Sequence, residues 1–166
     1  MQNSDDGTLY TSGSNVYRQL GRNHDAIGFF PVKIGSHRPM AISSGLGHSL
    51  VIAQPISSEP GMSTATLFSW GWNQQSQLGR PGLDSQPSEV EVLSGEVPVS
   101  VYGGRVHSIV VTSKQEAWAW GCGKSGRLGL GSSADEPEPA LVECLEGGQV
   151  LQAAAGFDHT LLLLAK

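Results

Sequence analysis

Three histidines in one recurring motif are the residues of this sequence that could most readily bind a metal or take part in catalysis. The motif is G-x-x-H followed by Ser or Thr and a run of aliphatic residues, and it ends at His48, His107 and His159. Three imidazoles could form a zinc site, and an imidazole beside a hydroxyl could serve a nucleophilic serine. However, no Asp or Glu recurs in step with the motif, and each histidine belongs to a different repeat. We therefore expect buried imidazoles that hold neighbouring backbone, with no metal-binding or catalytic role.

A second pattern with chemical meaning is GCGKSG at residues 121–126, which has the G-x-G-x-x-G spacing of a dinucleotide-binding turn. Such a turn must open a helix whose N-terminus holds the pyrophosphate. Residues 127–131 are RLGLG, and two glycines in five residues argue against a helix. The G-K-S end of a phosphate-binding loop is also incomplete, because its leading glycine would stand at Trp118. We interpret the pattern as a glycine-rich turn and predict no cofactor.

The elements that carry these residues form a threefold repeat. In each copy an alternating aromatic strand ends at a glycine, and a polar loop then leads to a Leu-Gly pair. The motif histidine follows the strand-ending glycine by 35, 36 and 38 residues, while the copies are 58 and then 50 residues apart. Because the strand-ending glycine and the motif histidine recur together at similar spacing, the sequence contains internal repeats. The strand-ending glycines are Gly13, Gly71 and Gly121, and the motif glycines are Gly45, Gly104 and Gly156.

The repeats divide the chain into residues 8–53, 66–112 and 113–166. We interpret residues 1–7 as a disordered lead-in and residues 54–65, rich in Ser and Pro, as an exposed loop insertion. Each repeat offers four short strands and no 3.6-residue period, which predicts an all-β fold. The predicted strands are 9–12, 32–34, 40–43, 49–53, 66–70, 89–93, 99–102, 108–112, 116–120, 141–145, 150–154 and 160–165.

Burial patterns extend this prediction to a β-propeller. Trp118 and Trp120 are two residues apart and so face the same side of a strand, and Phe68 and Trp70 repeat the arrangement. Residues 161–164 are apolar on both faces, which requires a sheet on either side. A radial stack of blades supplies such neighbours, and propellers close with about four to eight blades. We therefore expect a partial propeller of three four-stranded antiparallel blades, with open edges that could self-associate.

Composition argues against several classes of function. The net charge is −5 and the ten basic residues are scattered, which argues against nucleic-acid binding. From the polar, acidic start we expect no targeting segment, and the longest apolar run, residues 160–165, is too short to span a bilayer. Cys122 and Cys144 have no spacing typical of metal sites, and we expect reduced thiols in a cytoplasmic or nuclear protein.

The combined motif resembles the repeat of the regulator of chromosome condensation family. Its pattern is a strand with W-G-x-N-x-x-x-Q-L-G, then a proline, a hydrophobic strand and A-x-G-x-x-H-[ST]-x-x-L. The best matches are SWGWNQQSQLGR, AWGCGKSGRLGLG, AAAGFDHTLLL and SSGLGHSLVI. The resemblance implies a seven-bladed ring, of which three repeats are about half. The copies diverge where Ser12 replaces Trp, Arg18 and Ser76 replace the loop glycine, and Gly123 replaces Asn.

The resemblance also implies that the two residues between Gly and His of the motif emerge on one face, which relatives use for partners. Exposed aromatic and Arg side chains on such a face are typical binding hot spots. We therefore expect a non-enzymatic protein-interaction scaffold. The alternative is guanine-nucleotide exchange on a Ran-like small GTPase, for which residues 54–65 form the only sizeable insertion. The expected face residues are Leu46, Arg105, Val106, Phe157 and Asp158.

Overall fold

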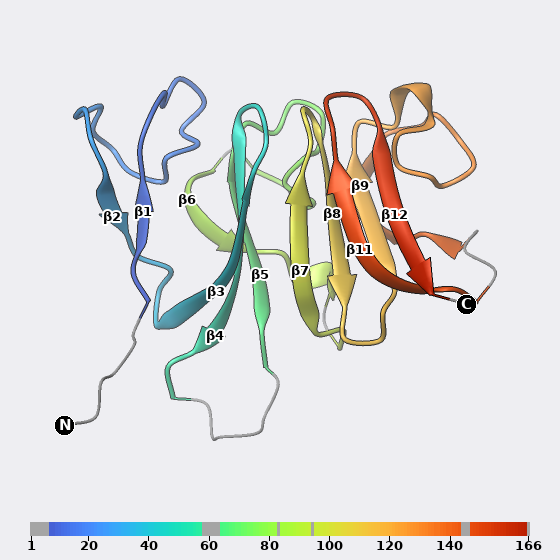
Figure 1. Ribbon diagram of the computed structural model, residues 1–166. Helices are drawn as coiled ribbons and strands as arrows, with labels where there is room; N and C mark the ends of the chain where they lie inside the picture. The colour runs from blue at the N-terminus through green and yellow to red at the C-terminus, as the bar shows by residue number, and fades with distance from the viewer. Residues whose placement is uncertain (1–6, 58–63, 83, 94, 144–146, 166) are drawn as a thin grey trace.

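The computed structural model describes residues 7–57, 64–82, 84–93, 95–143 and 147–165. Within these ranges the chain forms twelve β-strands and two short 3₁₀ turns, with no α-helix (Figure 1). Residues 1–6 of the expected lead-in and residues 58–63 of the expected insertion lie outside the described residues, and a strand continues into the start of the insertion as far as Pro55. The strands are β1 (Leu9–Thr11), β2 (Phe30–Val32), β3 (His37–Ser44), β4 (His48–Pro55), β5 (Thr66–Gly71), β6 (Asp84–Glu89), β7 (Pro98–Gly103), β8 (His107–Thr112), β9 (Ala117–Gly121), β10 (Glu136–Leu141), β11 (Gln149–Ala155) and β12 (Thr160–Ala165); the 3₁₀ turns are η1 (Glu91–Leu93) and η2 (Lys124–Gly126).

The strands form antiparallel sheets that stand side by side, as expected for part of a propeller (Figure 1). Two sheets are complete, with the orders β3-β4-β5-β6 and β7-β8-β9-β10, and two have only two strands, β1-β2 and β11-β12. The all-β class and the four-stranded antiparallel sheets are confirmed. The grouping corrects the expectation of three complete blades, because each sequence repeat places two strands in one sheet and two in the next. This offset links neighbouring sheets through the chain itself.

Three apolar layers fill the spaces between neighbouring sheets. The layer between the two complete sheets contains Leu50, Ile52 and Leu67 on one side and Val101, Val110 and Trp120 on the other. Corresponding layers lie between β1-β2 and the first complete sheet and between the second complete sheet and β11-β12. All six residues of β8 are buried, as expected for a strand with sheets on both faces.

In the second and third repeats, a tryptophan at the end of the aromatic strand reaches the loop of the preceding repeat. The indole N–H groups of Trp70 and Trp120 donate to the carbonyl oxygens of Gln19 (2.9 Å) and Gln77 (3.0 Å). Both rings are essentially fully buried. A Cβ on Gly79 would lie 2.6 Å from the Trp120 Nε1, which explains the glycine of the Leu-Gly pair. The tryptophan therefore joins neighbouring sheets as well as filling their core.

The outermost strands lie earlier in the chain than predicted. Residues 89–93 were expected to form a strand, but β6 ends at Glu89 and is followed by the 3₁₀ turn η1. Residues 141–145 were likewise expected as a strand, whereas β10 ends at Leu141. The strands that form instead, residues 84–89 and 136–141, contain prolines and acidic residues, which are typical of loops. An outer edge strand tolerates proline because one of its sides needs no ladder hydrogen bonds.

One loop position adopts a left-handed backbone in every repeat, and it yields a stability prediction. The φ angles are +63° at Arg18, +58° at Ser76 and +71° at Gly126. We expect Ser76→Gly to raise the free energy of unfolding by about 0.5–1 kcal/mol, because glycine adopts this conformation without steric cost. The reverse change, Gly126→Ser, should lower it by about 1 kcal/mol through backbone strain alone, since a Cβ there meets nothing within 4 Å. Thermal unfolding would measure both, and equal melting temperatures for all three proteins would contradict the prediction.

Candidate protein-binding face

The three G-x-x-H motifs form turns at one end of the molecule, at the top of Figure 1. They connect β3 to β4, β7 to β8 and β11 to β12. In each turn the glycine N–H donates to the histidine carbonyl oxygen at 2.9 Å. A Cβ on Gly45, Gly104 or Gly156 would lie 2.1–2.3 Å from the imidazole of its own motif, so only glycine fits. A Cβ on Gly45 would also lie 2.4 Å from the Gly104 carbonyl oxygen, and one on Gly104 would lie 2.8 Å from the Gly156 carbonyl oxygen; the three turns are therefore immediate neighbours.

The motif histidines connect each repeat to the next through a hydroxyl group. His48 Nε2 lies 3.0 Å from Ser108 Oγ, and His107 Nε2 lies 3.2 Å from Thr160 Oγ1. The Ser108 hydroxyl donates its single hydrogen to the Gln77 carbonyl oxygen (2.7 Å), so the imidazole must be the donor to Ser108. His48 therefore reaches the backbone through the Ser108 hydroxyl, whereas the His107 imidazole also interacts with the backbone of His159.

The electrostatic environment keeps two of these histidines neutral. Burial, with a smaller effect from the nearby His107, lowers the pKa of His48 to about 3. Burial, followed by the positive charge of Arg127, lowers the pKa of His107 to about 4. His159, in the last turn, is exposed. Each imidazole lies in a separate turn, and within the described ranges no group of three His, Cys, Asp or Glu side chains could hold a metal ion.

The glycine-rich segment 121–126 is a compact turn in the structure. Its end forms the three-residue turn η2, and no α-helix follows within the described residues. The Gly123 N–H, which would be needed to hold a phosphate, donates to the Asp135 carboxylate (2.8 Å). A Cβ on Gly123 would lie 1.6 Å from the Ala134 carbonyl oxygen. This close approach explains why the third repeat has glycine where the others have Asn15 and Asn73.

Four of the five expected face residues are accessible at the tips of the turns. Leu46 and Phe157 are 52% and 61% exposed, and the side chains of Arg105 and Asp158 are 41% and 46% exposed. Val106 is the exception, since only 6% of its surface is accessible. Its side chain packs into the protein, so it offers no surface to a partner in this structure.

Arg105, Phe157 and Asp158 form one ordered group that joins two neighbouring turns. The Arg105 guanidinium carbon lies 4.4 Å from the centre of the Phe157 ring, a cation–π distance. Asp158 Oδ1 lies 4.0 Å from Arg105 Nη1 and accepts a hydrogen bond from Arg127 Nη1 (2.6 Å). The Arg127 side chain is only 3% exposed, so Asp158 is held from beneath by a buried guanidinium. Arg127 occupies the place of Gln19 and Gln77 in the other repeats.

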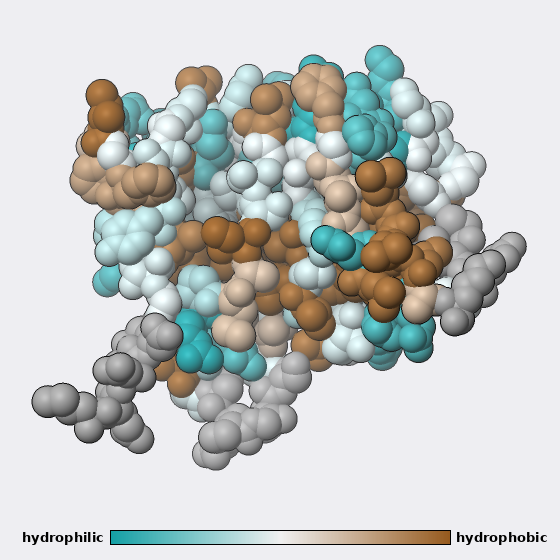
Figure 2. Space-filling model, viewed as in Figure 1, coloured by the Kyte–Doolittle hydropathy of each residue, from teal (hydrophilic) through white to brown (hydrophobic). Residues whose placement is uncertain are grey.

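Two aromatic residues on the same end of the molecule, Tyr17 and Trp72, were not predicted from the sequence. The rings of Tyr17 and Trp72 stack with their centres 4.8 Å apart and an interplanar angle of 19°. The backbone N–H of Trp72 donates to the Gly47 carbonyl oxygen (2.7 Å), which places this pair beside the Leu46 turn. The place of Trp72 in the repeat could have indicated it, because Trp72 follows the strand-ending Gly71, where the other repeats have a small residue. Figure 2 shows apolar residues, in brown and tan, scattered among teal ones along this upper end.

We call this surface the turn face, and we define it by the accessible residues at and beside the three turns. It combines aromatic, aliphatic and charged side chains on rigid turns of neighbouring sheets. No helix of the described chain is both long and apolar enough to cross a membrane. The members of the turn face are Tyr17, Leu46, Trp72, Arg105, Phe157 and Asp158.

The fold and the repeated turns define a β-propeller repeat protein, and comparison with known proteins identifies the family. The profile of the regulator of chromosome condensation (RCC1) repeat matches residues 6–52, 65–111 and 115–163. The chain belongs to this family.

Several known proteins are similar to the chain over most of its length. The ultraviolet-B receptor UVR8 of Arabidopsis thaliana is 26% identical over 163 residues, covering 95% of this chain and 35% of the receptor. The E3 ubiquitin-protein ligase HERC2 of Homo sapiens is 32% identical over 158 residues, covering 91% of this chain and 3% of the ligase. The chain thus spans about a third of the receptor and a small part of the ligase.

Solved structures share the fold at low sequence identity. Human WBSCR16 has a TM-score of 0.81 and 19% identity, covering 97% of this chain and 41% of that protein. Yeast RCC1 (Prp20), in its complex with Kap60, has a TM-score of 0.75 and 20% identity, covering 95% of this chain and 37% of that protein. These two likenesses establish the propeller arrangement of the strands.

Proposed function

We propose that this chain is a non-catalytic interaction module that binds a protein partner through the turn face. The observation that carries the proposal is the ordered Arg105–Phe157–Asp158 group. Exposed Arg and aromatic side chains dominate protein-binding hot spots. Here they are already held in place by a cation–π contact and by the buried Arg127, so little side-chain entropy would be lost on binding.

The proposal predicts that Phe157→Ala and Arg105→Ala weaken partner binding about tenfold or more each. Both side chains are exposed, so the fold should be retained, as circular dichroism and the melting temperature would show. Affinity capture with cross-linking would identify partners of the wild-type chain, and binding to the purified partner would then be quantified. Leu151→Ala is the matched control, because Leu151 is 54% exposed in β11, away from the turns. Unchanged affinity of both turn-face variants would rule out this surface.

The alternative proposal is guanine-nucleotide exchange on a Ran-like small GTPase. It is supported by the fold shared with yeast Prp20, a structure of which is described together with binding to Gsp1p and histones (TM-score 0.53, 16% identity). An exchange factor works by binding the nucleotide-free GTPase more tightly than the loaded form. Release of a fluorescent nucleotide from Ran would test this directly. Acceleration that Phe157→Ala removes would favour exchange, and no acceleration would leave the interaction module.

We further expect the chain to act in the cytoplasm or the nucleus and to require no cofactor. Cys122 is buried and unpaired, as expected for a thiol in a reducing compartment. Cys144 lies outside the described residues. The likeness to the ubiquitin ligase covers only 3% of that protein, so we assign no ligase activity.

A further inference from the structure

Positive charge gathers around the turn face, although the chain as a whole has a net charge of −5. Three loops, residues 14–19, 72–77 and 122–127, lie against the motif turns, and we call them the framing loops. Together the framing loops and the turns hold four of the ten basic residues of the sequence but one of its fifteen acidic residues. This end of the molecule is therefore positive. The basic residues are Arg18, Arg105, Lys124 and Arg127, and the acidic residue is Asp158.

Three carboxylates at this end of the molecule are already bound by the protein itself. Asp158 Oδ1 accepts a hydrogen bond from Arg127 Nη1 at 2.6 Å. In the neighbouring outer loops, Asp135 Oδ1 accepts from the Gly123 N–H at 2.8 Å. Asp25 Oδ1 lies 3.4 Å from the side-chain nitrogen of the asparagine in the first framing loop. These contacts use the negative charges within the chain and leave the positive ones unbalanced.

The basic side chains, by contrast, have donors that nothing in the described chain accepts. The side chains of Arg18 and Lys124 are exposed and form no hydrogen bond or ion pair with the described residues. The Arg105 guanidinium likewise donates no hydrogen bond to them, and its Nη1 lies 4.0 Å from Asp158 Oδ1. Since a guanidinium has five N–H donors, Arg105 can bind a further acceptor.

Arg105 has the best-defined position of these exposed cations. It lies in the middle motif turn, with another turn on either side, so the described residues surround it. Its guanidinium carbon lies 4.4 Å from the centre of the Phe157 ring, and its side chain remains 41% exposed. The N–H groups along the edge of a guanidinium match the two oxygens of a carboxylate. The contact with Phe157 orients this group before any partner arrives.

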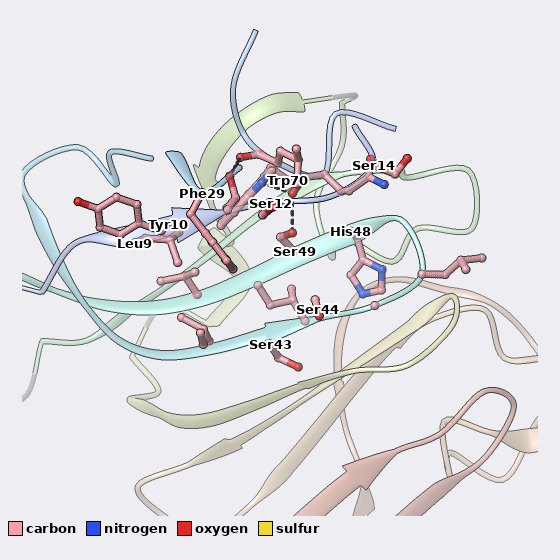
Figure 3. Close-up of a pocket in the computed structure, with 18 residues that line it drawn as sticks. Leu9, Tyr10, Ser12, Ser14, Phe29, Ser43, Ser44, His48, Ser49 and Trp70 are labelled. Atoms are coloured by element: carbon pink, nitrogen blue, oxygen red, sulfur yellow. Dashed lines mark hydrogen bonds between the residues drawn. The ribbon is translucent and has the colours of Figure 1, made fainter. Parts of the chain in front are cut away.

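The backbone that carries the other positive charges is also fixed in place. In the first repeat, the Ser49 hydroxyl and the Trp70 indole both donate to the Gln19 carbonyl oxygen, at 2.7 and 2.9 Å (Figure 3). Arg18 directly precedes this anchor. In the third repeat, the arginine of the framing loop donates through Nε to the Lys124 carbonyl oxygen at 2.8 Å. A partner would therefore meet a preformed pattern of charge, which lowers the entropic cost of binding.

We propose that the turn face binds an acidic protein segment, one carboxylate of which pairs with the Arg105 guanidinium. This inference rests on the proposed function and adds the chemistry of the partner. Charge complementarity carries it, because the positive end has free donors while its carboxylates are bound. An apolar side chain beside that carboxylate would contact Phe157, which is 61% exposed. A protein is favoured over nucleic acid, since four basic residues in a chain of net charge −5 are few for a phosphate backbone.

Random peptides displayed on phage are the probe for this partner chemistry. We expect the full chain to enrich peptides that combine Asp or Glu with an aliphatic or aromatic residue. The tightest of them, synthesised with a fluorescent label, gives a dissociation constant by anisotropy. Raising the ionic strength from about 0.1 M to about 1 M should weaken its binding about tenfold, because the Debye length falls from about 10 Å to about 3 Å. Enrichment of peptides without acidic residues, or of no peptide, would overturn the proposal.

Substitutions of Arg105 test the carboxylate contact directly. Arg105→Gln should weaken binding of the labelled peptide about tenfold to a hundredfold, because it removes a charge-assisted pair. Arg105→Lys keeps the charge and loses the planar fork, so its affinity should lie between those of Arg105→Gln and the wild type. Arg38→Gln is the matched control: it removes the charge of an exposed arginine at the start of β3, the end of that strand away from the turn, and should leave the affinity unchanged.

Phe157→Ala separates failure of this inference from failure of the proposed function. If Phe157→Ala weakens peptide binding and Arg105→Gln does not, the turn face binds a protein without recognising its charge, and the inference is wrong. If neither change has an effect, the peptide binds elsewhere and both proposals fall. Single-stranded DNA of mixed sequence is the last comparison. Tighter binding of this DNA than of the peptide would assign the positive end to nucleic acid and would also overturn the inference.

Discussion

Replacing Trp120 with alanine is expected to lower the free energy of unfolding by about 3–5 kcal/mol. The side chain is fully buried between the two complete sheets, and its N–H donates to the Gln77 carbonyl oxygen. Removing it would leave a large cavity in the layer that joins these sheets. Because small domains have a total stability of roughly 5–15 kcal/mol, this variant should be partly unfolded or close to it. Urea unfolding followed by far-ultraviolet circular dichroism would measure the loss.

Two further variants separate the cavity from other effects of losing a tryptophan. Trp120→Phe retains most of the ring volume and removes the N–H, so we expect a smaller loss of about 1–2 kcal/mol. Trp72→Ala removes a half-buried ring that stacks on Tyr17, and we expect a loss of about 1 kcal/mol. Equal losses for Trp72→Ala and Trp120→Ala would contradict the role assigned to Trp120 in joining the sheets.

The sequence was sufficient to predict the class of fold because two landmarks repeat in register. The strand-ending glycines have φ angles of +112°, +103° and +100°, a conformation that excludes most side chains. The motif glycines are required by the imidazoles that fold back over them. Such constraints act within one repeat and are visible as residue identity. Gly13, Gly71 and Gly121 could therefore be identified without coordinates.

The grouping of strands into sheets could not be predicted in the same way, because it depends on contacts between repeats. β4 pairs with β5 of the following repeat. The residue pattern within either strand does not determine which strand it pairs with. The prolines in β6 and β10 also argued against strands in these segments. Proline is tolerated there because both strands lie at a sheet edge, which the sequence alone does not reveal. Sequence periodicity identifies repeats, and the sheets cross the repeat boundaries.

The candidate face shows the same division between local and distant information. The position of Arg105 and Phe157 at the tips of turns was implied by the resemblance to the repeat of the family. The burial of Val106 did not, because its neighbour in the motif is exposed and only packing distinguishes the two. The contact of Asp158 with Arg127 joins residues 31 positions apart, and it depends on Arg127 replacing the glutamine of the other repeats. The rigidity of this group is therefore a property of the third repeat alone.

Lowering the pH from 7 to 5 is expected to reduce the free energy of unfolding by about 4 kcal/mol through His48 and His107 together. Their pKa values in the folded protein are about 3 and about 4, compared with 6.5 for an ordinary imidazole, which we take for the unfolded chain. The unfolded chain therefore binds more protons between these values, so stability is fully present above about pH 6.5 and falls as the pH decreases toward 4. Each imidazole accounts for about 2 kcal/mol of the loss by pH 5.

Urea unfolding at pH 7 and at pH 5 measures this effect above the range in which most carboxylates titrate. The double variant His48→Gln/His107→Gln should be less stable at pH 7 but should lose most of the difference between the two pH values. Ser108→Ala is the matched control: it removes the hydrogen-bond acceptor of His48 and should cost about 1 kcal/mol at both pH values. It keeps both imidazoles buried, so the fall in stability with pH should remain. If the double glutamine variant and Ser108→Ala show the same dependence on pH, protonation of these histidines does not limit the stability of the propeller in acid.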